Sequence, residues 1–581
     1  MCGIKFVVMA SPEARNWWAQ RHRCNVRRVI AGLLAFGCWF CLLAIPIGAI
    51  AQTKAPSEPT LPDAQERLGT QFFQKKDYAS ALLWYQKAAD QGNADAQNDL
   101  GWLYQHALGV TEDYADAAHW YRKAAEQGNP KAEGNLGWLY REGQGVPKDY
   151  GQAMLWFRKA AAQGNAFGEN NIGLLYENGY GVAQDYAQAA EWYRKSAERG
   201  NEGAENNLGH LYQNGLGVEQ DYAQAMAWYY RAASHGSAIA QNNVGTLYLN
   251  GFGVEKDYEK ARVWFQRAAD NGNLEGENNL GWLYEKGFGV KQDYMEAMNR
   301  FRKAASQGYA DAQNNIGWLY QNGWGVPQDY AEAMTWYRKA AEQGNLQASA
   351  NIGYLYTNGL SVKQDYAEAA IWYQKAAEQG HVKSQVYVGR LYQNGLGVPQ
   401  SYAKAMSWYI KAADQGNSEA QNDIGCLYQN GFGVKQDYAQ AMLWYRKAAD
   451  QGYAAAESNL GLLYENGLGV PQDHSQAQSW FKKAADHMLL PGGIRPPQVI
   501  YKPDPEYSEE ARKAKLEGTC VLSLSVDADG IPRDIKVVRS LGKGLDEKVI
   551  DAIKTWKFQP GTKDGVPVRT QIEIEVDLHL K

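Results

Sequence analysis

The sequence predicts a mainly α protein: an α/α right-handed superhelical solenoid of about twelve helical-hairpin repeats, followed by a small two-layer α+β domain. An Asp-Tyr pair recurs every 36 residues, from Asp77-Tyr78 to the variant pair Asp473-His474, in twelve copies. Each period contains two stretches of helically spaced apolar residues around a glycine-rich turn. After the last copy, the pattern changes to strict alternation near the C-terminus. A fixed period of this length is typical of hairpins that bury their apolar faces only by stacking on neighbours.

The period from Ala420 to Ala455 illustrates how each repeat is built. Ile424, Leu427 and Tyr428 have the spacing of one helix face, which we call helix A of the repeat. The segment NGFGV then ends this helix, because glycine adopts left-handed backbone at helix ends and turns. Asp437 is a favourable N-cap for the second helix, helix B. We therefore expect helix, glycine-rich turn and helix in each repeat.

Tryptophan is concentrated at one position of helix B. Eleven of the 20 tryptophans occupy it, from Trp84 through Trp480, and Arg300 is the one exception. Such regularity predicts core packing between repeats.

The N-terminal residues, 1–51, predict export of the rest of the chain. Residues 29–51 form an uncharged run that several arginines precede, and this arrangement is typical of a cytoplasmic N-terminus. The run is long enough for an inner-membrane anchor, but it also ends in Ala49-Ile50-Ala51, which fits a cleavage site. Both interpretations place the later residues in the cell envelope, on the periplasmic side, either anchored or released after cleavage near Ala51. Residues 52–63 are predicted to be a Pro-rich linker.

The solenoid is predicted over residues 64–487, and a Pro/Gly linker over residues 488–497. Residues 498–581 read as a separate domain. Residues 519–540 predict two strands joined by a turn at 527–530, and residues 545–557 predict a helix. Residues 569–580 alternate strictly, which predicts a strand with one buried face packed on that helix.

The repeats resemble the Sel-one-like repeat family, a relative of the tetratricopeptide repeats. The matching frame is A-x-x-x-L-G-x-x-Y, then G-x-G-V-x-x-D-Y, then A-x-x-W-Y-x-K-A-A-x-x-G. The first copy, from Leu68, has a turn four residues shorter, and terminal repeats are often atypical because they cap the stack. The resemblance implies an adaptor that binds proteins.

The C-terminal segment resembles the C-terminal domain of TonB-family energy transducers. The matches include Pro505-Glu506-Tyr507, the turn Asp529-Gly530 and the run Trp556 to Pro560. In that family the domain reaches outer-membrane receptors and captures a short receptor segment by strand addition, in which main-chain pairing supplies affinity. The resemblance implies a partner-binding strand that contains Gln571, Ile572, Glu573, Ile574, Glu575, Val576 and Asp577.

Energy coupling is a separate question. The family's membrane helix carries a histidine for coupling to an inner-membrane, proton-driven motor, whereas residues 29–51 contain none. The family's long Pro-rich spacer is also absent, and the solenoid is a candidate replacement for it.

Certain helix A positions line the concave groove of tetratricopeptide repeats, and the corresponding positions here carry amides and indoles. These groove candidates are Asn98, Trp102, Trp138, Asn170, Asn206, Asn242, Asn278, Trp282, Asn314, Trp318 and Asn422. A row of amides can hydrogen-bond an extended peptide, since each offers a donor and an acceptor. The alternative interpretation is packing between neighbouring repeats.

Charge and motif content exclude other classes of function. The chain has 59 basic and 64 acidic residues, which gives no indication of nucleic-acid binding. The nine histidines lack metal-site spacing, and no catalytic, metal-binding or cofactor-binding constellation is predicted. We expect an interaction protein: a TonB-family protein linked to transmembrane transport, with outer-membrane receptors and a proton-driven motor as partners, or a periplasmic scaffold without energy coupling.

Overall fold

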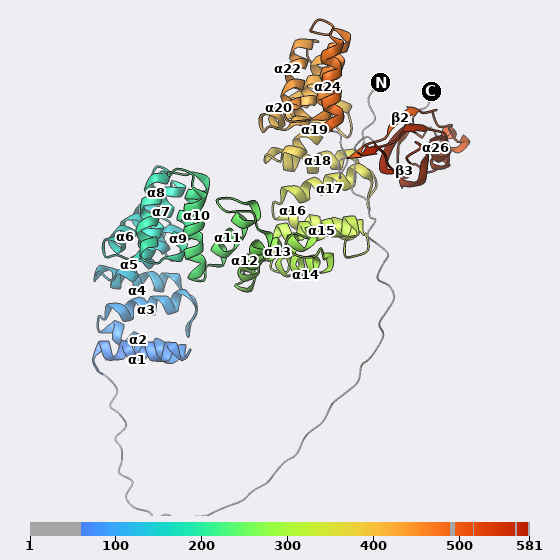
Figure 1. The fold of residues 1–581 in the computed structure, drawn as a ribbon. Coiled ribbons are helices and arrows are strands. Elements are labelled where there is room, and N and C mark those ends of the chain that lie inside the picture. Colours follow the sequence, from blue (N-terminus) through green and yellow to red (C-terminus); the bar gives the residue numbers. More distant parts are fainter. Residues whose placement is uncertain (1–59, 488–493, 515, 564–565, 579–581) are drawn as a thin grey trace, which may run out of the picture. The chain divides into compact units, whose positions relative to one another are not determined.

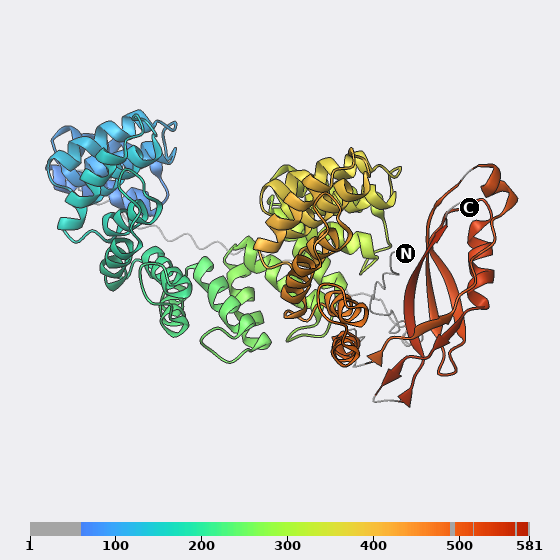
Figure 2. The ribbon, with the colours of Figure 1, turned by 90° about the horizontal axis from the view of Figure 1, so that it is seen from above.

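The computed structural model describes residues 60–487, 494–514, 516–563 and 566–578 (Figures 1 and 2). The N-terminal run at 29–51 lies outside the described residues, so its anchoring or cleavage stays a prediction. Among the described helices, none combines the length and the apolar composition needed to cross a bilayer. The described chain forms two compact units, residues 60–355 with 360–362, and residues 363–578 with 356–359.

The first unit consists of consecutive helical hairpins. Its helices are α1 (Pro62–Gln74), α2 (Tyr78–Asp90), α3 (Ala94–Gln105), α4 (Tyr114–Glu126), α5 (Pro130–Glu142), α6 (Tyr150–Ala162), α7 (Ala166–Asn178), α8 (Tyr186–Glu198), α9 (Glu202–Asn214), α10 (Tyr222–Ser234), α11 (Ala238–Asn250), α12 (Tyr258–Asp270), α13 (Leu274–Lys286), α14 (Tyr294–Ala305), α15 (Ala310–Asn322), α16 (Tyr330–Glu342) and α17 (Leu346–Asn358), whose last residues belong to the second unit.

The second unit continues the same hairpins and then changes fold. Its helices are α18 (Tyr366–Glu378), α19 (Val382–Asn394), α20 (Tyr402–Asp414), α21 (Ser418–Asn430), α22 (Tyr438–Ala449), α23 (Ala454–Asn466) and α24 (His474–His487). The predicted mainly α solenoid is therefore confirmed, with helix A at odd numbers and helix B at even numbers.

Side-chain caps start the helices where the sequence places short polar residues. Asp185 accepts hydrogen bonds from the backbone N–H groups of Ala187 and Gln188, both at 3.0 Å, at the start of α8. This confirms the predicted aspartate cap of helix B. Helix A is capped as well, since Asn165 accepts from Gly168 N at 2.8 Å before α7. Such caps satisfy N–H groups that have no partner inside the helix.

Within each hairpin, a glycine of helix A lies against an aromatic ring of helix B. A Cβ atom added at Gly209 of α9 would lie 2.7 Å from Cδ1 of Tyr229 in α10, a residue that is 1 % exposed. The same contact joins Gly137 to Phe157 and Gly317 to Tyr337. Glycine is required here by close approach of the ring, not by backbone conformation.

The helix B tryptophans pack between neighbouring repeats, as predicted. Trp120 of α4 is 9 % exposed and packs into the cluster that contains Tyr85 of the preceding hairpin and Leu100 of its own hairpin. Lys123 lies over its ring, with Nζ 4.4 Å from the centroid. The lysine stem and ammonium therefore cover the outer face of the buried indole.

Two of the longer turns between helices hold a residue other than glycine in left-handed backbone. Ser361 has φ of +61° at a position where other repeats have glycine, for example Gly325 at +70°. Ala107 has φ of +52° at the position that corresponds to Gly143 at +73°. Left-handed backbone costs an L-residue with a Cβ atom about 1–2 kcal/mol.

We expect Ser361→Gly and Ala107→Gly each to stabilise the solenoid by about 1 kcal/mol, because glycine removes the steric cost at positive φ. Chemical denaturation followed by far-ultraviolet circular dichroism measures this. Ser306→Gly is the matched control, since Ser306 has φ of −64° at the end of α14, and there glycine should destabilise. Equal effects of Ser361→Gly and Ser306→Gly would contradict the argument.

The C-terminal domain consists of short strands and two helices after the last hairpin. Its elements are β1 (Ile494–Arg495), β2 (Gln498–Tyr501), α25 (Glu509–Lys513), β3 (Gly518–Val526), β4 (Pro532–Arg539), α26 (Leu545–Lys554), β5 (Lys557–Gln559), β6 (Thr562–Lys563), β7 (Val566–Pro567) and β8 (Thr570–Leu578). The main sheet has the antiparallel order β4-β3-β8. β2 pairs with β5, and β1, β6 and β7 form a third small sheet.

The core of this domain lies between the main sheet and α26. Leu545, Val549 and Ile553 of α26 are fully buried against Leu522 and Ile574 of the sheet. The predicted hairpin, the helix and the alternating strand are therefore confirmed. The helix ends at Lys554, earlier than predicted, because the chain turns at Thr555 and residues 557–559 pair with β2.

Candidate functional site

The strand β8 lies at one edge of the main sheet. It pairs with β3 over nine residues, from Gly518 opposite Leu578 to Val526 opposite Thr570. Within the described part of the chain, no strand pairs with the other edge of β8. Unpaired N–H and C=O groups along such an edge are a template for a further strand.

The side chains of β8 separate into two faces. Ile572, Ile574 and Val576 are between 2 % and 7 % exposed and belong to the core, whereas Gln571 is exposed and Glu573 and Glu575 are half-buried. Asp577 lies opposite Thr519 of β3 in the register of the sheet. The buried side chains hold β8 against the core, so the unpaired backbone edge of the strand stays exposed for a partner.

The outward face of β8 carries negative charge without a basic cross-strand neighbour. Glu573 lies opposite Ser523, and Glu575 lies opposite Val521. Burial and then the neighbouring Glu575 raise the pKa of Glu573. A further strand with basic side chains at these positions would relieve this repulsion, because opposite charges on adjacent strands attract.

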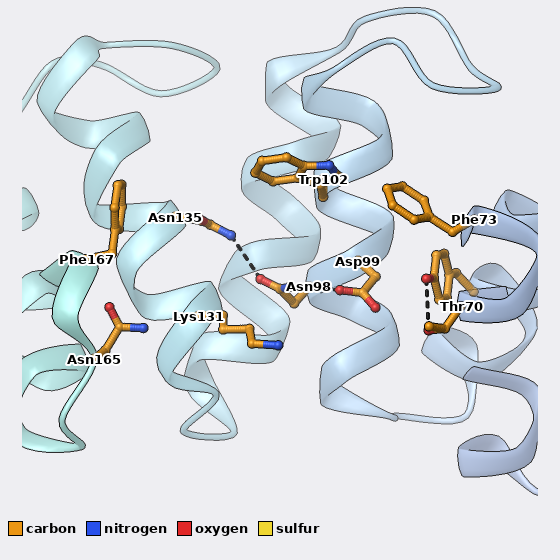
Figure 3. A pocket seen from close by; sticks show the side chains of 10 residues that line it. Thr70, Phe73, Asn98, Asp99, Trp102, Lys131, Asn135, Asn165 and Phe167 are labelled. Carbon is orange, nitrogen blue, oxygen red and sulfur yellow. Dashed lines mark hydrogen bonds between the residues drawn. The ribbon is translucent and has the colours of Figure 1, made fainter. Parts of the chain in front are cut away.

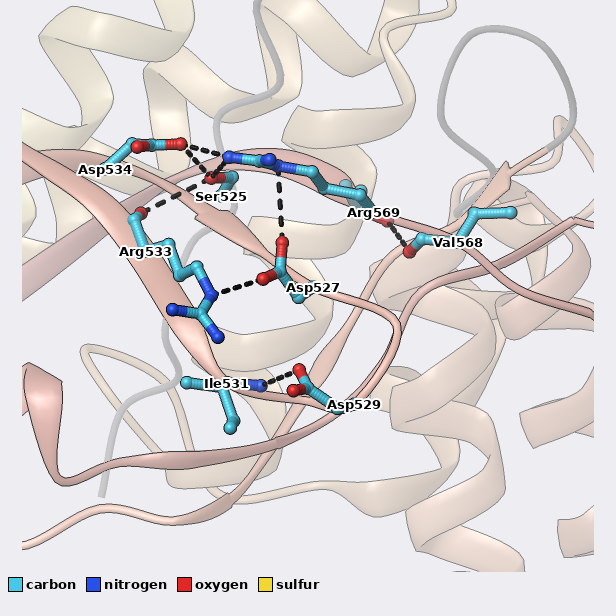
Figure 4. A network of polar contacts seen from close by, with 9 residues as sticks. Ser525, Asp527, Asp529, Ile531, Arg533, Asp534, Val568 and Arg569 are labelled. Atoms are coloured by element: carbon cyan, nitrogen blue, oxygen red, sulfur yellow. Dashed lines mark hydrogen bonds and ion pairs between the residues drawn. The ribbon is translucent and has the colours of Figure 1, made fainter.

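The start of β8 is tied to the β3–β4 turn by a polar network (Figure 4). The guanidinium of Arg569 pairs with Asp534 and with Asp527, at 3.3 Å for the latter, and donates to the Ser525 hydroxyl at 2.9 Å. Arg533 pairs with the same Asp527. This network fixes the point at which the chain enters the edge strand.

A second polar cluster lies between β4 and α26. Asp546 accepts hydrogen bonds from Leu541 N at 2.8 Å, from Gly542 N at 3.3 Å and from the Ser540 hydroxyl. Partial burial opposes ionisation of this carboxyl, but these hydrogen bonds outweigh it and lower its pKa. The cluster therefore stabilises the loop before α26 when Asp546 is ionised.

We expect the C-terminal domain to lose stability as the pH falls below about 3.9, the ordinary pKa of an aspartate. A carboxyl with a lowered pKa in the fold contributes stability above its unfolded pKa and loses it as the pH falls through its folded pKa. Asp546→Asn should cost roughly 1–2 kcal/mol at neutral pH and flatten the acid limb. Hydrogen exchange of residues 516–563 across pH measures both, and an unchanged acid limb in the variant would contradict the assignment.

The predicted groove asparagines lie between helix A segments of successive repeats. Each amide oxygen in the following set accepts a hydrogen bond from an asparagine 37 residues later, an arrangement that we call a rung. The rungs, from acceptor to donor, are Asn98–Asn135 at 3.0 Å, Asn170–Asn207 at 3.3 Å, Asn206–Asn243, Asn242–Asn279, Asn278–Asn315 and Asn314–Asn351, and Asn422–Asn459, these last five at 2.9 Å. The amide oxygens thus already serve the contact between repeats.

The predicted groove tryptophans differ in exposure. Trp102 is 40 % exposed and stacks on His106 with centroids 3.7 Å apart. Trp138, Trp282 and Trp318 are half-buried, and Trp318 contacts Trp324 edge-on. Trp102 is therefore the indole of this set with most surface left for a partner.

A cavity of about 410 Å³ lies on the first four repeats (Figure 3). It brings Asn98 and Trp102 together with residues that the sequence interpretation did not select. Its lining consists of Thr70 and Phe73 of α1, Tyr85 of α2, Asn98, Asp99 and Trp102 of α3, Lys131 and Asn135 of α5, and Asn165 and Phe167 at the start of α7.

Asp99 is the unusual group of this cavity. Burial raises its pKa to about 6, with opposing hydrogen bonding from Asn98 and further contributions from Glu66, Lys131 and Asp95. Asn98 Nδ2 donates to its carboxylate at 3.1 Å. In most other repeats asparagine occupies this position, as at Asn135 and Asn207, so the exception was visible in the sequence.

Within the described residues, no group of three or more His, Cys, Asp or Glu side chains has the arrangement of a metal site.

Comparison with known proteins matches both parts of the chain. The Sel1 repeat model matches twelve segments, residues 62–93, 94–129, 130–165, 166–201, 203–237, 238–273, 274–309, 310–345, 346–381, 382–417, 418–453 and 454–487. The model of the Gram-negative bacterial TonB protein C-terminal matches residues 503–580.

Curated relatives match the C-terminal segment. The chain is 36 % identical to protein TonB of Vibrio cholerae over 88 residues, which are 15 % of this chain and 36 % of that protein. It is 32 % identical to protein tonB2 of Pseudomonas aeruginosa over 82 residues, 14 % of this chain and 30 % of that one. The chain thus spans about a third of the length of these relatives.

Solved structures match the repeats. The crystal structure of c5321, a protective antigen of uropathogenic Escherichia coli strains with an SLR fold, is 38 % identical, covers 70 % of this chain and 87 % of its own, and has a TM-score of 0.47. A Sel1 repeat protein from Oxalobacter formigenes is also 38 % identical, covers 41 % of this chain and 98 % of its own, and has a TM-score of 0.39.

Proposed function

Because the chain belongs to the Sel1 repeat family and ends in a TonB-type domain, we propose that it captures an extended segment of an outer-membrane receptor on β8. Both families are non-catalytic protein-interaction scaffolds, so the chain is an interaction protein of the cell envelope and not an enzyme. The twelve repeats serve as a protein-binding scaffold and as the spacer that carries the C-terminal domain.

The observation that carries this proposal is the unpaired edge of β8. Nine residues pair with β3 on one side, and the described residues place no strand on the other. The side chains of Ile572, Ile574 and Val576 anchor the strand in the core of the domain. A partner segment can thus add main-chain hydrogen bonds without rearrangement of the domain.

Disulfide mapping with the full-length protein tests strand capture. A single cysteine replaces Gln571, Glu573 or Glu575 in this protein. A second cysteine is placed at each position in turn along the periplasmic segment of a TonB-dependent receptor. Strand addition predicts cross-links at every second receptor position, shifting by two residues as the site on β8 shifts by two. Cross-links without this alternation would contradict strand addition.

The opposite edge of the sheet provides the matched control. Lys536 and Val538 are exposed on β4, the other outer strand, and cysteines there should give no registered pattern. Cys426 and Cys520 form no disulfide in the described part of the chain, and the sequence has four further cysteines at Cys2, Cys24, Cys38 and Cys41. All six are therefore first replaced by serine or alanine. Equal yields from both edges would indicate adventitious contact instead of a docking strand.

A periplasmic adaptor without energy coupling is the second candidate, and the absence of histidine from residues 29–51 favours it. The two proposed functions predict different N-terminal residues for the mature protein. A protein in the inner membrane that starts near Met1 supports coupling to a proton-driven motor. A soluble protein that starts at Gln52 leaves the adaptor role alone, because a released protein cannot carry work from the inner membrane.

A further inference from the structure

At the junction between the first and second repeats, two acids stand where most other junctions have a rung. The packing glycines Gly69 of α1 and Gly101 of α3 are equivalent, so Glu66 stands where the next repeat has Asn98. Asp99 stands where most later repeats have an asparagine. Two carboxylates therefore replace the two amides of a rung at this junction. Glu66 contributes to the raised pKa of Asp99.

The chain itself shows what an aspartate at this position binds. Asp423 of α21 is equivalent to Asp99, and Arg390 of the preceding helix A pairs with it, with Nη2 2.9 Å and Nε 3.1 Å from Oδ2. Arg390 also pairs with Glu419 at 2.6 Å. The guanidinium thus bridges two acids through several charge-assisted hydrogen bonds.

No such cation reaches Asp99 from within the described chain. Arg390 directly follows Gly389, and the equivalent residue of α1, directly after Gly69, is Thr70. Thr70 carries no charge, and its hydroxyl donates to Glu66 at 2.8 Å. Lys131 acts on Asp99 electrostatically and lowers its pKa, but no ion pair between the two is found among the described residues.

We propose that the cavity on the first four repeats binds an arginine side chain of an extended polypeptide, with Asp99 as the ion-pair acceptor. The polypeptide is thus a partner of the solenoid, not of β8. The inference rests on one half of the proposed function, namely the scaffold role of the repeats, and is independent of strand capture.

The other residues that line the cavity suit the aromatic, apolar and main-chain contacts of such a polypeptide segment. Phe73, Trp102 and Phe167 offer apolar surface beside the acid, and the latter two are 40 % and 39 % exposed. A guanidinium is attracted to an aromatic face as well as to a carboxylate. The amides of Asn135 and Asn165 can meet a peptide main chain. A cavity of about 410 Å³ exceeds the needs of one side chain, so flanking residues also fit.

The charged form of Asp99 is unfavourable in the fold, because burial opposes ionisation of its carboxyl. The groups that act on Asp99 are Glu66 on α1, Tyr85 on α2, Asp95 on its own helix, Tyr121 on α4 and Lys131 on α5. A carboxyl whose folded pKa is raised makes the protein more stable at low pH and less stable as the pH rises through about 6. Asp99→Asn should therefore raise the Tm at pH 7.5.

Fluorescence anisotropy with the full-length protein tests the proposal. The probe is an acetylated, amidated, fluorescein-labelled peptide of alternating serine and glycine with a central Leu-Arg-Leu. The control probe carries citrulline, a neutral isostere, in place of arginine. We expect the arginine probe to bind at least about tenfold more tightly, since hydrogen bonds between charged groups are worth that much. Binding should also weaken about tenfold from pH 7.5 to pH 5, as Asp99 becomes protonated.

Two variants make the test specific. Asp99→Asn should remove the preference for arginine and most of the pH dependence, while the stacking of His106 on Trp102 should be retained. Thr70→Arg reproduces the arrangement of Arg390, so it should occupy Asp99, raise the Tm and abolish binding of the probe. Asp414→Asn removes the same charge from an exposed position in α20 and should change nothing.

Three results would overturn the inference. The first is equal binding of the arginine and citrulline probes. The second is an Asp99→Asn variant that has a native circular dichroism spectrum and binds the arginine probe as tightly as the unmodified protein does. The third is the absence of saturable binding up to millimolar concentrations of the probe. Each leaves the cross-linking pattern on β8 unaffected, so failure of this site and failure of strand capture are distinguishable.

Discussion

Trp556→Ala is expected to unfold the C-terminal domain while the repeats stay folded. Trp556 is 4 % exposed, packs in the core with Phe558, and donates from Nε1 to the carbonyl oxygen of Pro503 at 3.2 Å. Removal of a buried aromatic side chain costs about 3–5 kcal/mol, because a cavity remains and transfer free energy is lost. A small domain has little stability beyond that amount.

Hydrogen exchange measured by mass spectrometry resolves the two regions of the protein. In Trp556→Ala, peptides from β3, β8 and α26 should lose protection, whereas peptides from the repeat helices should keep it. Val538→Ala is the control, since Val538 is 56 % exposed on β4 and its truncation should change stability by less than about 0.5 kcal/mol. Retained protection of β8 in Trp556→Ala would show that the indole is not part of a cooperative core.

Gly317→Ala is expected to destabilise the solenoid although alanine favours helix. The new Cβ atom would lie 2.6 Å from Cε1 of Tyr337 and 3.2 Å from the backbone oxygen of Ala333. Tyr337 is fully buried and its hydroxyl donates to Gln321 at 2.9 Å, so the ring cannot move freely. Overpacking costs about 1–3 kcal/mol and exceeds the gain of up to ~1 kcal/mol in helix propensity.

Gly203→Ala gives a matched comparison of opposite sign. Gly203 is near the start of α9, where the nearest atoms that a Cβ would meet are the side-chain oxygen of Asn201 at 3.3 Å and the amide of Asn170 at 4.0 Å. There alanine should stabilise by about 0.5–1 kcal/mol. Urea denaturation followed by circular dichroism measures both variants. Stabilisation by both would mean that the helix hairpins tolerate a wider separation than the ring contact indicates.

Local signals in the sequence were sufficient for much of the fold. Asp437 caps α22 through Gln440 N at 2.9 Å, and the alternation through Ile572 and Ile574 gives β8 its buried face. Both features act over a few residues, which is the range in which propensity and periodicity operate. The strands β2 and β5 were not predicted, because three or four residues carry too little pattern and their pairing joins distant segments.

The candidate sites were harder to predict because they depend on contacts between repeats. A row of asparagines looks the same in sequence whether its amides face a ligand or one another, and only the 37-residue spacing of the hydrogen bonds separates the two. Asp99 is similar. The sequence shows an aspartate where most repeats have asparagine. The electrostatic effect of Glu66 on it depends on how α1 aligns with α3 across a shortened turn.

The rungs also bear on how this protein acquires its length. Asn243 donates to Asn206, and Asn279 donates to Asn242, with the same geometry at 2.9 Å. Removal of residues 238–273 would bring Asn279 into the place of Asn243, opposite Asn206, so the new junction would have the same chemistry as the old ones. Insertion of a 36-residue unit would do the same in reverse. Unequal recombination within the gene can therefore change the number of repeats one at a time, and each new junction keeps its rung.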